Sequence, residues 1–214
     1  RCQLKGSSAK DVPNKARFIL VAAQPLGYIL KPSSQHSMSM ATMNASNQSV
    51  LDELRSLLTP EDVRTDPESL EHYGQDWTRF HTPAPLAIVF PRNIDQVQAL
   101  VGWARKHRLG LVPSGGRTGL SAAAVALHGE VVVSFDRMNS IGAFNPIDRT
   151  VCCGPGVITE ALQEFAKEHE LHYPVDFASA GSSQIAGNIA TNAGGINVIR
   201  YGMTRDWVAG LKVV

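Results

Sequence analysis

Residues 113–121 form a glycine-rich segment, Pro-Ser-Gly-Gly-Arg-Thr-Gly-Leu-Ser, that directly follows an apolar run. Gly115, Gly116 and Gly119 allow positive φ and carry no Cβ atoms, so successive backbone N–H groups can converge on one anion. The serine and threonine hydroxyls of the segment add further donors. The spacing differs from the Walker loop, which requires Gly-Lys-Ser/Thr, and from GxGxxG. The segment therefore predicts a loop that binds pyrophosphate, and a tight structural turn is the alternative interpretation.

Residues 176–195 form a second unusual segment, in which small residues and amides dominate. Only Phe177, Ile185 and Ile189 are large and apolar. Small side chains let a backbone lie flat against a planar ligand. The flanking stretches 173–174 and 196–202 have the composition of structured segments, which argues against a flexible Gly/Ser linker. The segment therefore predicts a contact with a planar ring.

The histidines and cysteines show no pattern of a metal centre or a redox pair. The histidines have no partners at the spacing of metal ligands, and no CxxC spacing is present. Cys152 and Cys153 are adjacent on an expected strand, so their side chains point to opposite faces, which favours packing roles over redox chemistry. We therefore expect no metal site, and the sequence assigns no catalytic base.

Alternating strand and helix patterns surround both segments. Residues 86–90 are continuously apolar and predict a buried strand, a helix follows from the N-cap Asn93, and residues 111–113 predict a second strand. The connection has the length of a crossover between parallel strands. Further strands are expected at 130–134 and 150–153. This order predicts a mixed fold with the glycine-rich loop at the end of a strand.

Three parts of the chain differ in composition. Residues 1–44 are basic and serine-rich, and we expect an unstructured extension, with a transit or signal peptide as alternatives. Residues 45–81 contain two helical patterns and are expected to form an N-terminal helical segment, followed by the main domain at 82–214. The apolar run 211–214 predicts the opening of a strand, so this domain is expected to be C-terminally incomplete.

Composition and charge exclude several classes of protein. The 214 residues carry 20 Lys+Arg and 19 Asp+Glu, a balance that argues against nucleic acid as a partner. The apolar stretch 18–30 is too short for a transmembrane helix, which needs about 20 residues. The few cysteines favour a reducing compartment. We therefore expect a cytoplasmic protein, or a mitochondrial one if residues 1–43 act as a transit peptide.

Four motifs occur in an order that resembles a known family. They are Ser-Gly-Gly-Arg-Thr-Gly-Leu at 114–120, Pro-Val-Asp at 174–176, Ile-Ala-Gly-Asn-Ile-Ala-Thr-Asn-Ala-Gly-Gly at 185–195 and Arg-Tyr-Gly at 200–202. Residues 51–214 resemble the FAD-binding domain of the vanillyl-alcohol oxidase/p-cresol methylhydroxylase flavoproteins. Within this family the chain is most similar to the branch that contains D-2-hydroxyglutarate dehydrogenase, FAD-linked D-lactate dehydrogenase and the FAD subunit of glycolate oxidase.

The resemblance implies an α+β fold, the two-lobed FAD-binding domain of the p-cresol methylhydroxylase type, truncated in its second lobe, with FAD extended between the lobes. The backbone donors of the first segment would wrap the pyrophosphate, with two residues nearby and one serine hydroxyl as a further donor: Gly115, Gly116, Arg117, Thr118, Gly119 and Leu120 would wrap it, Ala124 and Val125 would lie near it, and Ser114 would supply the hydroxyl. Residues in and near the second would line the ribityl and isoalloxazine side: Pro174, Ala180, Gly181, Ser182, Gly187, Asn188, Asn192, Ala193, Gly194 and Gly195. Ala186 departs from the family pattern, because relatives often carry glycine there, and its methyl group would crowd the flavin.

The resemblance also implies an oxidoreductase in which a hydride passes from the Cα of a D-2-hydroxy acid, of the 2-hydroxyglutarate, lactate or glycolate type, to flavin N5. An electron acceptor other than nicotinamide would reoxidise the flavin. FAD would be bound non-covalently, because Arg117 stands where some relatives carry a histidine tether. Substrate and metal ligands are expected in a C-terminal region. The alternatives are an FAD-dependent oxidase of another alcohol and an FAD-binding fragment without activity of its own.

Overall fold

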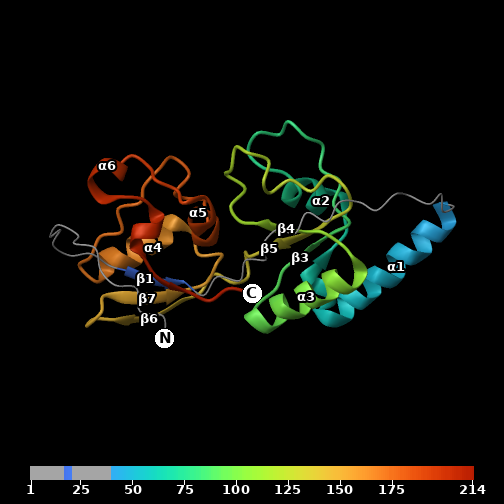
Figure 1. The fold of residues 1–214 in the computed structure, drawn as a ribbon, viewed down its shortest axis with the longest axis horizontal. Coiled ribbons are helices and arrows are strands. Elements are labelled where there is room, and N and C mark those ends of the chain that lie inside the picture. Colours follow the sequence, from blue (N-terminus) through green and yellow to red (C-terminus); the bar gives the residue numbers. More distant parts are fainter. Residues whose placement is uncertain (1–16, 21–39) are drawn as a thin grey trace.

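The computed structural model describes residues 17–20 and 40–214, which form two lobes that lie side by side (Figure 1). Each lobe is built on a four-stranded sheet, with strand order β2-β3-β5-β4 in the first and β6-β7-β1-β8 in the second. Among the described residues, no helix is both long and apolar enough to cross a membrane. The arrangement is the mixed fold that the strand and helix patterns predict, in the two lobes that the family resemblance implies.

The first lobe has a largely parallel sheet. Its elements are α1 (Met40–Leu57), the 3-10 helix η1 (Pro60–Asp62), β2 (Val63–Arg64), α2 (Pro67–Tyr73), β3 (Ala87–Val89), α3 (Ile94–His107), β4 (Leu111–Ser114) and β5 (Val131–Ser134). β3 and β4 both pair in parallel with β5, while β2 is antiparallel to β3. The strands that α3 connects are therefore not neighbours, since β5 lies between them. The crossover leaves the glycine-rich segment at the C-terminal end of β4.

The helices α1 and α3 pack on this sheet through one hydrophobic core. Leu54 of α1 and Leu100 of α3 are fully buried together with Val131 and Val133 of β5. Replacing a fully buried leucine by alanine typically costs about 2–5 kcal/mol of unfolding free energy. The segment 45–81, which the sequence predicts as a separate helical part, is thus joined to the first lobe by its core.

The second lobe combines a mixed sheet with short helices. Its elements are β1 (Arg17–Leu20), β6 (Ile141–Asn145), β7 (Thr150–Cys153), α4 (Thr159–Glu168), α5 (Ile185–Thr191), α6 (Val198–Tyr201), the 3-10 helix η2 (Thr204–Trp207) and β8 (Val208–Leu211). β6 is antiparallel to β7, and β1 is parallel to both β7 and β8. Leu162 of α4 and Ile185 of α5 are buried against Val151, Tyr173 and Trp207. This core fixes the position of α5.

The adjacent cysteines of β7 point to opposite faces, as the strand geometry predicts. Cys152 is exposed and Cys153 is buried, and both are free thiols. Burial raises the pKa of the Cys153 thiol to about 12. The buried thiol is therefore protonated at neutral pH and acts as an apolar packing residue.

The two ends of the described chain differ from the sequence-based expectations. Within 1–44, which the sequence predicts to be unstructured, Arg17–Leu20 forms β1, and α1 begins at Met40. Residues 1–16 and 21–39 lie outside the described residues. The strand predicted to open at 211–214 is not formed there: β8 ends at Leu211, residues 212–214 lie outside any strand, and Val214 packs against the core of the first lobe. Both differences arise from tertiary pairing, which local composition does not report.

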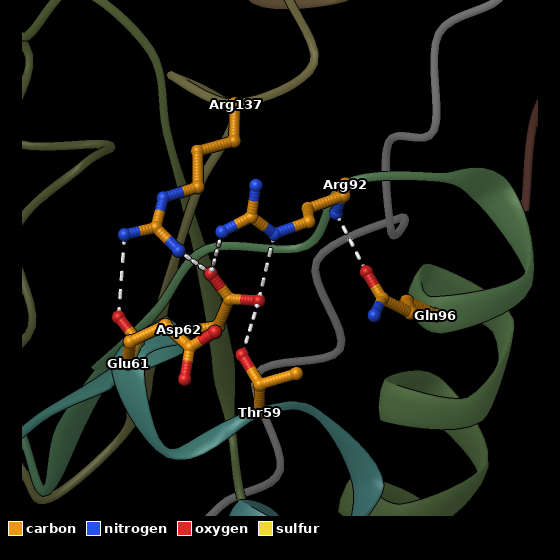
Figure 2. Close-up of polar contacts among 6 residues, drawn as sticks. All are labelled: Thr59, Glu61, Asp62, Arg92, Gln96 and Arg137. Carbon is orange, nitrogen blue, oxygen red and sulfur yellow. Dashed lines mark hydrogen bonds and ion pairs between the residues drawn. The ribbon is translucent and has the colours of Figure 1, made fainter.

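A buried carboxylate anchors the start of the loop after β5 (Figure 2). Asp62 is fully buried and receives two hydrogen bonds of 3.0 Å from Arg92, together with an ion pair from Arg137. Thr59 donates to the same carboxylate over 2.8 Å. Asp62 is fully buried and depends on these partners to compensate its charge, although the Arg92 side chain is half exposed to solvent. Asp62 thereby fixes Arg137 and, with it, the neighbouring Asp136.

Candidate functional site

A cavity of about 340 Å³ lies between the two lobes. Its walls come from the glycine-rich segment after β4 and from α5, which lies on the side of the second lobe that faces the first (Figure 1). The lining residues are Asp76, Pro113, Gly115, Gly116, Arg117, Thr118, Gly119, Ser121, Ala123, Ala124, Phe135, Phe177, Ser179, Gln184, Ala186, Gly187, Asn188, Ala190, Thr191 and Ala193. The two segments singled out in the sequence therefore face one another across a single space.

The cavity contains only part of the residue set that the resemblance implies. Its lining includes Gly115, Gly116, Arg117, Thr118, Gly119, Ala124, Gly187, Asn188 and Ala193. The other residues of that set do not line it: Ser114, Leu120, Val125, Pro174, Ala180, Gly181, Ser182, Asn192, Gly194 and Gly195. Several of these shape the second lobe instead. The Pro174 carbonyl accepts from Asn197, and Asn192 caps α5 with a φ of 50°.

The glycines of the first segment act through their missing side chains and not through positive φ. None of Gly115, Gly116 and Gly119 has a φ in the left-handed region, which corrects the expectation from the sequence. The left-handed residues of this loop are Arg117 and Ala122, at 55° and 58°. A Cβ on Gly116 would overlap the carbonyl of Ser182 in the second lobe. Gly116 therefore allows the two backbones to approach closely.

Two glycines of the lining leave open space for a ligand. A Cβ on Gly119 or on Gly187 would meet no protein atom within 4 Å. A side chain at either position would therefore extend into unoccupied volume beside the cavity wall. Because the local packing does not require glycine there, the absence of a side chain suits a ligand that approaches the backbone closely.

The glycine-rich loop offers a row of uncommitted hydrogen-bond donors. Among the described residues, the backbone N–H groups of residues 116–119 have no acceptor. Asp76 and Arg117 are the ionisable residues of the lining, so the described walls carry little net charge. Successive free N–H groups in such a loop make a concave site for an anion. The geometry thus supports anion binding by the backbone more than by cationic side chains.

Asp76, which the sequence analysis did not single out, binds Ala122, the residue that directly follows the glycine-rich segment 113–121. Its carboxylate is buried and accepts from the Ala122 N–H over 2.7 Å and from the Thr78 hydroxyl over 2.6 Å. Burial alone would raise the pKa of Asp76, but the bonds from Thr78 and Ala122 outweigh it and hold the pKa below its ordinary value. The ionised carboxylate thereby stabilises the left-handed conformation of Ala122.

The Arg117 side chain lies against the first lobe. Its guanidinium sits 4.5 Å from the centre of the Tyr73 ring, donates to the Gly115 carbonyl over 3.0 Å, and lies 3.3 Å from His72. Such stacking of a guanidinium on an aromatic face is favourable. The Arg117 side chain therefore fixes the glycine-rich segment against α2. The segment contributes mainly its backbone to the cavity.

Two buried polar atoms near the cavity have no partner in the described part of the chain. They are the Ser114 Oγ atom and the Gln184 Oε1 atom, and Gln184 itself lines the cavity. By contrast, the amide nitrogen of Asn188 is committed, because it donates to Thr159 over 2.6 Å. Buried polar atoms are normally paired, so an unpaired acceptor at a cavity wall fits a ligand that carries a donor.

Sequence reasoning missed Asp76, Gln184 and Ala123, whereas Ser121, which it counted among the hydroxyl donors of the first segment, does line the cavity. The signal for Asp76 was weak, because it lies almost forty positions before the loop it holds and depends on a long-range contact. Gln184 stands inside the second segment as its largest polar residue, which could have drawn attention to it. In the described residues, no group of three or more His, Cys, Asp or Glu is placed to hold a metal ion.

Comparison with known proteins shows similarity to an FAD-binding domain and to D-2-hydroxyglutarate dehydrogenases. The family model described as "FAD binding domain" matches residues 85–214. D-2-hydroxyglutarate dehydrogenase of Stutzerimonas stutzeri is 67% identical over 165 residues, which are 77% of this chain and 36% of that protein. The enzyme of the same name from Xanthomonas citri is 58% identical over 152 residues, 71% of this chain and 32% of that protein. The chain thus spans about a third of the length of these curated relatives.

The fold has solved counterparts. A crystal structure of p-cresol methylhydroxylase with substrate bound superimposes with a TM-score of 0.55 at 24% identity, and the match covers 74% of this chain and 30% of that one. At this identity the likeness concerns the fold alone. It confirms the p-cresol methylhydroxylase-like arrangement of the two lobes that the sequence motifs imply.

Gly187→Val is expected to weaken FAD binding about tenfold or more without unfolding the protein, because the isopropyl group would occupy ligand space. Gly102→Val is the matched control. Gly102 is also a helical glycine with no atom within 4 Å of a built Cβ, but it lies on α3, away from this cavity. Quenching of flavin fluorescence measures both affinities, and an equal loss in the two variants would contradict the assignment of the cavity.

Proposed function

The chain belongs to the FAD-binding domain family, and from this premise we propose that it holds FAD for the dehydrogenation of a D-2-hydroxy acid, with D-2-hydroxyglutarate as the preferred substrate. The observation that carries the cofactor assignment is the cavity whose wall presents the uncommitted N–H groups of residues 116–119. The names of the curated relatives support the choice of substrate.

In this proposal, each lobe binds a different part of the cofactor. The backbone of residues 116–119 would bind the pyrophosphate, because its N–H groups have no other acceptor and no lysine of the described lining competes for it. Gly187, Ala190 and Thr191 of α5 would face the flavin half, where small side chains permit close contact. When bound, the flavin supplies the redox chemistry by accepting the hydride of the substrate. The protein's own residues hold and orient it.

The described lining residues support a cofactor held without a covalent bond. Histidine, cysteine and tyrosine, the usual tethering side chains, are missing from the described lining. His72 lies next to the Arg117 guanidinium outside this lining, and the Cys153 thiol is buried in the core of the second lobe. We therefore assign a non-covalent mode of FAD binding.

The described lining also limits which steps this chain performs. Asp76 is bound to Thr78 and Ala122, and Arg117 to Gly115 and Tyr73, so neither is free to remove the proton of a substrate hydroxyl. We assign to these residues the binding of the flavin, and we place proton abstraction and recognition of the hydroxy acid outside the lining described. An electron acceptor other than nicotinamide completes the proposed reaction.

Acid precipitation of the purified yellow protein is expected to release all of the flavin into the supernatant. The reason is that the described cavity wall offers no histidine, cysteine or tyrosine that could tether the flavin. Absorbance near the flavin bands of the supernatant and of the redissolved pellet measures the partition. Colour that stays with the pellet would contradict the non-covalent assignment.

The natural protein, expressed from its complete reading frame, is expected to reduce a dye with D-2-hydroxyglutarate roughly tenfold or more faster than with D-lactate or glycolate. D-2-hydroxyglutarate has a second carboxylate, which D-lactate and glycolate lack. A site that binds this second carboxylate therefore makes fewer contacts with the two smaller acids. Dye reduction under equal flavin content is the measurement. A flavin-loaded protein that prefers another alcohol would overturn the substrate assignment and leave the FAD assignment intact.

A further inference from the structure

One side-chain bridge joins the two lobes directly beside the cavity. Asp136, which follows β5 in the first lobe, receives a hydrogen bond of 2.7 Å from the Gln184 Nε2 atom of the second lobe. Its other oxygen accepts from the Tyr73 hydroxyl of α2 over 3.1 Å. Both carboxylate oxygens of Asp136 are thus used by residues that lie 63 and 48 positions away.

The bridge determines which end of the Gln184 amide points away from Asp136. A carboxylate can only accept hydrogen bonds, so the amide must turn its NH₂ group toward Asp136. The backbone of Gln184 is fixed as well, because it forms an isolated bridge with Ile158 and precedes Ile185, whose N–H donates to Val157 over 2.9 Å. The Oε1 atom is therefore held on the opposite side, next to Gly115.

The Oε1 atom has no donor among the described residues. Gln184 is 5% exposed, lines the cavity, and its Oε1 atom is buried without a hydrogen-bond partner. Leaving a buried acceptor unpaired is costly, so the arrangement fits a state in which a ligand supplies the donor. Phosphate oxygens cannot do so, because they are acceptors. FAD carries donors on its adenosine half as well, but Gln184 directly precedes α5, which we assign to the flavin half, so the donor is a ribityl hydroxyl or the ring N–H.

Tyr73 reinforces this orientation from the first lobe. Burial, followed by the charge of Asp136, raises the pKa of the Tyr73 hydroxyl, so it stays protonated and donates to the carboxylate. The Arg117 guanidinium stacks on the Tyr73 ring and donates a hydrogen bond to the Gly115 carbonyl. The glycine-rich loop and the Gln184 amide are therefore positioned by the same two residues, Tyr73 and Asp136.

We propose that Asp136 is a positioning residue that orients Gln184, so that the Gln184 amide oxygen accepts a hydrogen bond from the flavin half of FAD. This inference rests on the proposed binding of FAD and extends it to a contact that joins both lobes. The acceptor belongs to the second lobe, while its orientation is set by a residue of the first.

The first test compares FAD with ADP, a probe that keeps the pyrophosphate and lacks the flavin half. Gln184→Met preserves the length of the side chain but removes the acceptor, and is expected to weaken FAD binding about tenfold while changing ADP binding less than about twofold. Gln163→Met is the control, because Gln163 donates a comparable bond to the Val175 carbonyl within the same lobe and lies outside the cavity. It is expected to leave both affinities unchanged.

The second test exchanges the two partners. Gln184→Glu alone places two carboxylates face to face and is expected to weaken FAD binding more than Gln184→Met does. Adding Asp136→Asn restores a donor, because the new amide can donate to the nearer oxygen of the introduced carboxylate while the farther oxygen still accepts from the flavin. The double variant is expected to bind FAD within about threefold of the wild type. Thermal melting of every variant reports whether the fold is retained.

The outcomes separate this inference from the proposed function. Wild-type affinity for FAD in Gln184→Met, a parallel loss of FAD and ADP, or a double variant no better than Gln184→Glu would each overturn the positioning role. A wild-type protein that binds neither FAD nor ADP would overturn the proposed function itself. If Gln184→Met fails to fold, the comparison of Gln184→Glu with the double variant decides.

Discussion

The molecule depends on a main-chain contact between its lobes, where Gly116 in the loop after β4 lies directly against the carbonyl of Ser182 in the loop before α5. A Cβ at residue 116 would overlap that carbonyl, so the two backbones meet only because the residue has no side chain. The contact brings residues 115–119 to one wall of the cavity and residues 184–193 to the other. The cavity is therefore a product of the lobe contact and belongs to neither lobe alone.

Carboxylates held by distant partners fix the elements around this contact. Asp62 holds Arg92 and Arg137 near the start of the loop after β5, and Asp76 holds the Ala122 end of the glycine-rich loop. Both are buried, so their bonds compete little with water. When side chains outside the cavity fix the conformation of a loop, its backbone N–H groups can remain available to a ligand in the cavity. This support explains how the N–H groups of residues 116–119 can lack an acceptor among the described residues.

The sequence predicted most of the periodic elements and singled out the two segments that line the cavity, because strand burial, helix caps and small-residue runs are local signals. The buried β3, the Asn93 cap of α3 and the opposed cysteines of β7 followed from such signals. The role of Gly116 did not, since local rules suggested positive φ, whereas the structure uses the residue for a contact with a segment 66 positions later. Asp76, Gln184 and the pairing of β1 likewise depend on long-range contacts that one sequence does not display.

Amide hydrogen exchange of residues 113–121, followed with and without FAD, tests most directly whether the glycine-rich loop donates its N–H groups to the cofactor. The expected result is a marked slowing of exchange at residues 116–119 on addition of FAD, with the already paired amides of β5 unchanged. Unchanged exchange at residues 116–119 in a sample saturated with FAD would contradict the assignment of the pyrophosphate to this loop.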